Sequence, residues 1–107
     1  MVHLPPLPGS PGGRPLAEVQ AAALRDAEAL LSAGFDGLVV ENFGDSPFYK
    51  DRVLPITVAA MTAVAARLRE QMGEGATLCI NVLRNDARAA LAIAAALGAD
   101  ALRVNVH

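Results

Sequence analysis

Short runs of β-branched and other apolar residues alternate along the chain with longer runs rich in alanine and leucine. The short runs indicate strands; the longer runs, whose larger apolar residues recur three and four positions apart, indicate helices. Proline before the first helical run, proline opening the second and glycine after all three are usual at helix starts and stops. The predicted strands are Met1–Leu4, Gly37–Glu41, Thr77–Leu83 and Ala101–Val106, and the predicted helices are Leu16–Ala33, Pro55–Met72 and a third that follows Asp86 and runs to Leu97.

The order of these elements, βαβαβαβ, predicts an α/β fold with four parallel strands. One side of the strands is uniformly apolar, whereas the other side carries His3, Glu41, Asn81, Arg103, Asn105 and His107. A doubly wound open sheet has helices on both sides and therefore apolar residues on both. The first βα turn also lacks a G-x-G-x-x-G fingerprint. The pattern favours the N-terminal half of a (β/α)₈ TIM barrel, with strand order 1-2-3-4 and three helices on the convex side.

Composition limits the classes of protein that fit. The 107 residues suffice for one small domain, and 53 % hydrophobic with 19 % charged residues indicates a globular chain. A net charge of −2 without a basic face argues against nucleic acid as a partner. The single cysteine, Cys79, excludes an internal disulfide and fits a reducing compartment. Because neither a signal peptide nor a spanning segment is evident, we expect a cytoplasmic protein.

The polar side of the strands carries the candidate chemistry. Glu41 is a candidate catalytic acid–base group or an acceptor for sugar hydroxyls; alternatively, it forms an ion pair with Arg103 that fills the lumen. His107 is the second catalytic candidate, as a general base or hydrogen-bond donor. His3, His107 and Glu41 are residue types that bind divalent metals, but no short His-x-His spacing supports such a site. No cofactor is therefore predicted, with a divalent metal as the less favoured alternative.

Further polar residues at the strand ends are candidates for ligand contact, since amides and charged groups suit a polyhydroxyl or anionic ligand. The predicted ligand-binding residues are His3, Asn42, Asp45, Lys50, Asn81, Arg84, Asn85, Asp86, Arg103 and Asn105. Two alternatives remain open: Asn85 with Asp86 caps the third helix, and Arg84 is a solvated loop residue. Asp45 and Lys50 belong to a connection, Asn42–Leu54, that is longer than most βα loops and is typical of a binding loop.

Five strings at the strand ends together resemble the BtpA family, also called BtpA/SgcQ: Val2–Pro11, Asp36–Asp45, Pro47–Asp51, Asn81–Asp86 and Arg103–His107. The resemblance covers the whole chain in the family's order. It implies a TIM barrel grouped with the ribulose-phosphate-binding barrels. It also implies photosystem I biogenesis in phototrophs, with peripheral membrane or photosystem association, and a nucleosidase or sugar-related role elsewhere.

The family's barrel is more than twice as long as this chain. We therefore expect residues 1–107 to form a partial barrel, strands one to four with helices one to three, truncated at both ends. The resemblance implies a protein that binds or acts on a sugar-, nucleoside- or phosphate-type metabolite. The alternatives are a non-catalytic photosystem I biogenesis factor and an inactive truncated product, so enzyme activity stays open. We also expect self-association, because the first and fourth strands would present open edges.

Overall fold

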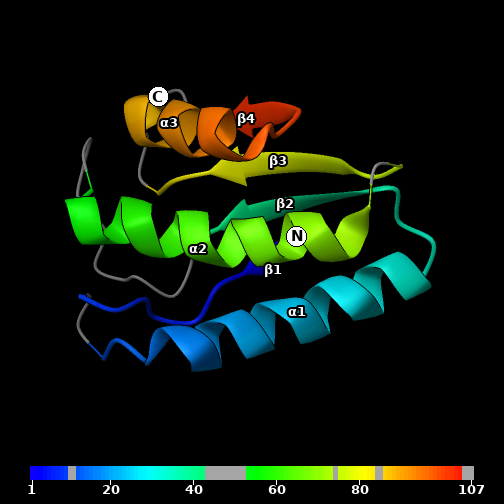
Figure 1. Cartoon of the computed structure of the whole chain (residues 1–107), viewed down its shortest axis with the longest axis horizontal. Coiled ribbons are helices and arrows are strands. Elements are labelled where there is room, and N and C mark those ends of the chain that lie inside the picture. The colour runs from blue at the N-terminus through cyan, green and yellow to red at the C-terminus, as the bar shows by residue number, and fades with distance from the viewer. Residues whose placement is uncertain (10–11, 43–52, 74, 84–85, 105–107) are drawn as a thin grey trace.

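The computed structural model describes residues 1–9, 12–42, 53–73, 75–83 and 86–104, which form an α/β fold (Figure 1). Within these residues four strands alternate with three helices, as the sequence pattern predicts. The strands are β1 (Val2–His3), β2 (Gly37–Glu41), β3 (Thr77–Asn81) and β4 (Ala101–Arg103), and the helices are α1 (Leu16–Ser32), α2 (Pro55–Met72) and α3 (Ala87–Leu97).

The strands form one parallel sheet in the order β1-β2-β3-β4, which confirms the predicted order. Figure 1 shows α1 and α2 lying side by side across one side of the sheet, with α3 beside α2 and next to β4. Each helix thus connects two neighbouring strands and packs near them. This is the arrangement of strands one to four and helices one to three in half a (β/α)₈ barrel.

The core lies between the helices and the apolar side of the sheet. Val40 and Ile80 are fully buried there, and Met61 and Leu68 of α2 are equally inaccessible. Burial of each such side chain contributes about 1.5–3 kcal/mol to folding. The helices cover the side that alternation marks as apolar, so the prediction of helices on one side is confirmed for the described elements.

The opposite side of the sheet, here called the open face, carries none of the described helices. His3 and Arg103 are exposed on this face, and Val39 and Cys79 are half-buried. These residues alternate along their strands with the buried apolar ones, as pleated strands require. His3, Glu41, Asn81 and Arg103 therefore lie on the side that carries none of the described helices, although Glu41 and Asn81 are buried there.

Local sequence explains the start and end of α3. Asp86 is its N-cap, and its Oδ1 accepts a hydrogen bond from the backbone N–H of Ala89 at 2.9 Å. The helix ends at Gly98, which adopts a left-handed conformation with φ of 66°. Glycine adopts this conformation without steric cost, whereas other residues are strained there. The predicted cap and the predicted stop are both confirmed.

Three strands are shorter than the sequence pattern predicts, and the first of them, β1, covers Val2–His3 in place of Met1–Leu4. β3 was expected to reach Leu83 but ends at Asn81, because the N–H and C=O of Leu83 bond to the side chain of Asn42 instead of a strand. β4 was expected to reach Val106 but ends at Arg103, and residues 105–107 lie outside the described residues. Apolar character alone therefore overestimates the length of these three strands.

At the amino ends of the strands, Asp100 joins β3 to the start of β4. Its Oδ2 accepts hydrogen bonds from Leu78 N at 2.9 Å and from Arg69 Nη1 at 3.2 Å. The hydrogen bond from the Leu78 N–H, and then the charge and hydrogen bond of Arg69, lower the pKa of the Asp100 carboxyl despite its partial desolvation. Arg69 Nη1 also donates to Ala76 O at 3.3 Å. We call these four residues the Asp100 cluster.

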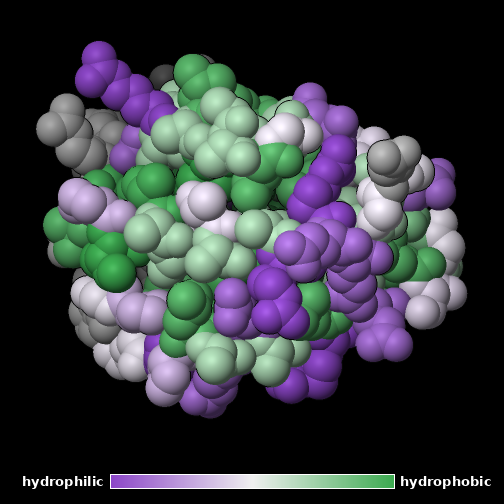
Figure 2. Space-filling model, in the orientation of Figure 1, coloured by the Kyte–Doolittle hydropathy of each residue, from purple (hydrophilic) through white to green (hydrophobic). Residues whose placement is uncertain are grey.

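The helix side has a different surface from the open face. Figure 2 shows hydrophilic side chains gathered over the C-terminal half of α2, beside mostly pale, weakly hydrophobic residues. A shallow groove of about 350 Å³ lies between α1 and α2, lined by Leu24, Arg67, Glu70 and Gln71. None of these residues belongs to the predicted site, so the open face is the side that carries the candidate chemistry.

Candidate functional site

Four polar residues lie in one register row across the sheet. His3 of β1 pairs with Glu41 of β2, Glu41 pairs with Asn81 of β3, and Asn81 pairs with Arg103 of β4. Register partners on neighbouring parallel strands are about 4.8 Å apart and project to the same side. We call His3, Glu41, Asn81 and Arg103 the polar row. The sequence predicts that six polar residues converge at the carboxyl ends of the strands. The register brings these four into one row, and the other two, Asn105 and His107, lie outside the described residues.

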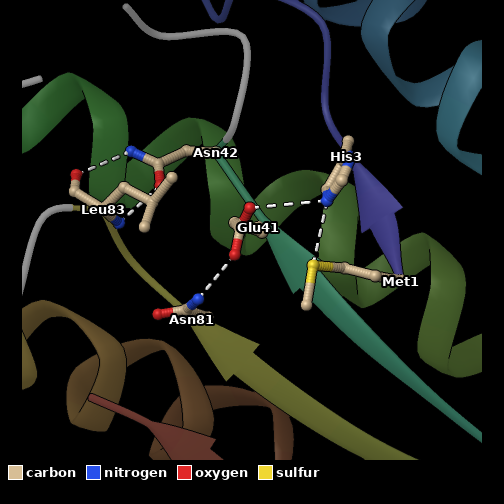
Figure 3. A network of polar contacts seen from close by, with 6 residues as sticks. All are labelled: Met1, His3, Glu41, Asn42, Asn81 and Leu83. Carbon is tan, nitrogen blue, oxygen red and sulfur yellow. Dashed lines mark hydrogen bonds and ion pairs between the residues drawn. The ribbon is translucent and has the colours of Figure 1, made fainter. Parts of the chain in front are cut away.

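The centre of the polar row is a buried pair. Asn81 Nδ2 donates a hydrogen bond to Glu41 Oε2 at 2.6 Å, and the two residues are 1 % and 6 % exposed (Figure 3). Hydrogen bonds to an ionised carboxylate are short and about twice as strong as neutral ones. The pair offsets part of the cost of taking the carboxylate out of water.

The other end of the Asn81 amide is unsatisfied. Because Nδ2 faces the carboxylate, Oδ1 points away from it, and within the described residues this buried oxygen has no hydrogen-bond partner. Leaving a buried acceptor unpaired costs about 1–3 kcal/mol, and such atoms are rare in folded proteins. Asn81 Oδ1 therefore keeps an unused capacity to accept a hydrogen bond.

His3 lies at the β1 end of the row. Its Nε2 is 3.5 Å from Glu41 Oε1 and 3.0 Å from Met1 Sδ, and its side chain is 49 % exposed (Figure 3). Its half-exposed ring therefore lies between solvent and the buried Glu41 carboxylate. His3 and Glu41, which the sequence places on the same side of the strands, are therefore in contact.

The predicted ion pair between Glu41 and Arg103 is wrong. The carboxylate of Glu41 contacts Asn81 and His3 instead, and within the described residues Arg103 makes no salt bridge. The reason is the strand order: β3 lies between β2 and β4, which separates the two charges by two strand spacings, about 9.6 Å. The polar side chain that fills this gap is Asn81.

Cys79 lies on the open face two residues before Asn81 and is half-buried. Burial raises the pKa of the Cys79 thiol, and the positive charge of Arg103 partly counteracts that rise. The sequence argument used this residue only as an indicator of redox compartment. Because side chains alternate along β3, Cys79 faces the same side as Asn81, and this pattern in the sequence could have placed it beside the site.

Two other predicted residues have their polar atoms bonded to backbone. Asn42 is buried; its Nδ2 donates to Leu83 O at 3.1 Å and its Oδ1 accepts from Leu83 N at 2.6 Å (Figure 3). Asp86 is also buried, and its Oδ2 accepts from Val53 N at 2.7 Å in addition to the Ala89 cap. Both side chains hold backbone at the carboxyl ends of the strands. The alternative of a capping role is thus confirmed for Asp86.

Six predicted site residues lie outside the described residues: Asp45, Lys50, Arg84, Asn85, Asn105 and His107. His107 was one of the two catalytic candidates and one of the residues in the metal alternative. Within residues 1–9, 12–42, 53–73, 75–83 and 86–104, no group of three or more His, Cys, Asp or Glu side chains is placed to hold a metal ion. The described site therefore consists of the polar row with Cys79 beside it.

Comparison with known proteins gives the family. The model of the BtpA family matches residues 1–107, the whole length of the chain. The chain belongs to the BtpA family. This confirms the resemblance carried by the strings at the strand ends.

Individual BtpA relatives come from distant organisms. A protein of Archaeoglobus fulgidus is 52 % identical over 98 % of this chain, and the photosystem I biogenesis protein BtpA of Synechocystis is 50 % identical over 99 % of it. A protein of Caenorhabditis elegans whose name includes "mitochondrial" is 32 % identical over 96 % of the chain. The chain spans 42 %, 37 % and 39 % of the lengths of these relatives, respectively. No solved structure gives a significant match.

Within this BtpA chain, the described helices include none long and apolar enough to cross a membrane.

The buried centre of the polar row consists mainly of hydrogen-bond acceptors, namely the Glu41 carboxylate and Asn81 Oδ1. Hydroxyl and amine groups donate to such acceptors, whereas a second anion beside Glu41 would be repelled. The centre is thus suited to a neutral, donor-bearing group.

Proposed function

We propose that the polar row binds a small polyhydroxyl metabolite of the sugar or nucleoside type and that Glu41 is its acid–base group. The observation that carries this proposal is the buried Asn81 Oδ1, which has no partner among the described residues and lies beside a buried carboxylate. A ligand hydroxyl that donates to this oxygen would remove the cost of an unpaired acceptor.

The neighbouring groups support chemistry as well as binding. A carboxylate beside a sugar stabilises the positive charge that develops when a glycosidic bond breaks. His3, at 3.5 Å from Glu41 Oε1, connects that carboxylate to solvent for proton exchange. The reaction that Glu41 and His3 fit best is a nucleosidase-like hydrolysis, in which a water molecule adds to the sugar carbon, the bond to the base breaks, and the proton that water gives up is passed to the leaving base.

We further propose that the complete protein is a (β/α)₈ barrel, as in a ribulose-phosphate-binding barrel, and that the open face lines its lumen. Support comes from the one-sided placement of the helices and from an open groove of about 420 Å³ between α3 and β4. Its lining is largely apolar and includes Leu91, which is 60 % exposed, and Leu102. A further helix and strand would bury this groove in the longer relatives.

The alternative function is a non-catalytic role in photosystem I biogenesis, with association at the photosystem or the membrane surface. Its support is the name of the Synechocystis relative, which is 50 % identical over 99 % of the chain. In this alternative the polar row binds a ligand without turning it over, because a barrel can lose its chemistry and keep its binding site.

The test is a titration of the protein and of its Glu41→Gln variant with ribose and adenosine, followed by NMR at the Asn81 side-chain amide. We expect the variant to keep its fold and to bind at least about tenfold more weakly, because the charge is lost while the shape is kept. Glu70→Gln, which changes an exposed glutamate on the helix side, is the matched control.

Assays of adenine release separate the two functions. Release by the wild type and none by Glu41→Gln supports the nucleosidase-like reaction, whereas binding without release favours the biogenesis role. Normal binding by Glu41→Gln would make Glu41 a structural residue and defeat the proposal.

We also propose that the described unit self-associates. β1 and β4 are the edge strands of the sheet, and Leu102 and Val104 at the second edge are 37 % and 36 % exposed. Open parallel edges with apolar neighbours pair readily with other chains. Sedimentation should show dimers or larger species, and a cooperatively folding monomer at all concentrations would contradict this.

A further inference from the structure

Arg103 differs from the other members of the polar row. Within the described residues it makes no salt bridge, and it is exposed at the β4 end of the row. It lies on the open face, because it is in register with Asn81 and because its positive charge reaches the Cys79 thiol on that face. An unpaired guanidinium in a site is suited to bind an anion, often through two parallel hydrogen bonds.

The charges of the row are arranged in sequence across the strands. Glu41 on β2 is negative, Asn81 on β3 is neutral, and Arg103 on β4 is positive. Neighbouring strands are about 4.8 Å apart, so an anion at Arg103 lies about two strand spacings from the carboxylate, with the amide of Asn81 between them. An anion at Asn81 itself would lie next to Glu41 and be repelled.

We propose that the ligand of the polar row carries an anionic group in addition to its hydroxyls, and that Arg103 binds this group while Asn81 Oδ1 accepts a hydroxyl proton. This inference rests on the proposed function. It specifies a class, an anionic sugar derivative, and an orientation across the strands, with the hydroxyl end toward β2 and the anionic end toward β4.

The experiment uses three probes on the wild-type protein: ribose 5-phosphate, ribose and inorganic phosphate. We expect ribose 5-phosphate to bind more tightly than either part alone, by up to about fivefold, since an exposed ion pair adds at most about that factor. Ribonate, which carries a carboxylate in place of the phosphate, shows whether the site requires phosphate or accepts any anion. A gain with either anion supports the inference.

Variants assign the anionic end to its residue. Arg103→Gln should remove the advantage of ribose 5-phosphate over ribose, so that the variant binds the two probes with similar affinity. Arg25→Gln, which removes an exposed arginine of α1 on the helix side, is the matched control and should keep the advantage. Because Arg103 is exposed, a thermal melt is expected to confirm that Arg103→Gln folds.

The outcomes distinguish the inference from the function on which it rests. If ribose binds at the polar row and ribose 5-phosphate binds no better, or if Arg103→Gln keeps the advantage, the inference is overturned and the proposed function stands. If phosphate alone binds as tightly as ribose 5-phosphate, the pairing of hydroxyl and anion is overturned as well. If no probe perturbs the Asn81 amide, both proposals fail.

Discussion

The two ends of the same sheet use their carboxylates in opposite ways. At the amino end, Asp100 is partly exposed, and its Oδ2 is shared by a backbone N–H and an arginine. At the carboxyl end, Glu41 is buried, and the asparagine beside it has an acceptor without a partner among the described residues. The first arrangement satisfies its polar groups and stabilises the fold, whereas the second leaves binding capacity unused. In barrels of parallel strands, residues at the amino ends of the strands generally stabilise the fold, whereas ligands bind at the carboxyl ends.

Replacing Asn81 is expected to have the largest effect on stability and tests whether the carboxyl end of the sheet stabilises the fold. Asn81→Leu should cost about 3 kcal/mol of unfolding free energy, because the buried Glu41 carboxylate loses its donor. The double variant Glu41→Leu/Asn81→Leu should instead be about 1 kcal/mol more stable than wild type, because both the buried charge and the unpaired oxygen are gone. Urea unfolding measures both values; a double variant as unstable as the single one would show that the row stabilises the fold.

Asp86 is an exception at the carboxyl end, since both of its carboxylate oxygens are bonded to backbone N–H groups. We expect Asp86→Ala to lower the unfolding free energy by about 2 kcal/mol, one part from the helix cap and one from Val53. Asp86→Ser keeps a capping oxygen and should recover about half of the loss. Equal losses for the two variants would show that the cap contributes little.

The Asp100 cluster should give the fold a dependence on acid. The hydrogen bond from Leu78 N and the charge of Arg69 hold the pKa of Asp100 below its ordinary 3.8 in the folded state. The contribution of Asp100 is therefore fully present above that value and is lost as the pH falls through the folded pKa. Melting temperatures between pH 6 and pH 2 should fall less steeply for Asp100→Asn than for wild type. Parallel curves would mean that this carboxyl does not contribute.

The smallest expected effect concerns Cys79. Since burial raises the pKa of its thiol and Arg103 partly counteracts the rise, its alkylation at pH 8 should be slower than that of a free thiol. Arg103→Gln should slow it further, by less than about tenfold. Rates of reaction with iodoacetamide between pH 7 and pH 10 provide the measurement, and a faster reaction in the variant would place Arg103 away from the thiol.

Much of the fold follows from two local signals in the sequence: the alternation of apolar and polar residues in the strands, and the residues that begin and end the helices. The alternation in the strands assigns Val40 and Ile80 to one side and Glu41 and Asn81 to the other, and the structure confirms both. The ends of α3 follow from Asp86 and Gly98. Such features depend on neighbours in sequence, so one chain suffices to predict them.

The site was predicted only in part because its contacts join separate strands. The sequence indicates that Glu41 needs a partner, but the choice between Arg103 and Asn81 depends on which strand lies next to β2. The pairing of Asn42 with the backbone of Leu83 was missed for the same reason, since it joins positions 41 residues apart. Side-chain amides that replace strand hydrogen bonds leave no periodic signal in the sequence.

The register of β2 gives the polar row one more property. A slip of β2 by a single residue relative to its neighbours would turn Glu41 toward the helices and Val40 onto the open face. A slipped molecule would still contain the same strands and helices and would give a similar circular dichroism spectrum. It would lack the row, and therefore the site at which we propose that a ligand binds. The fraction of a refolded preparation that binds a probe therefore measures how many molecules have the native register of β2, which circular dichroism does not report.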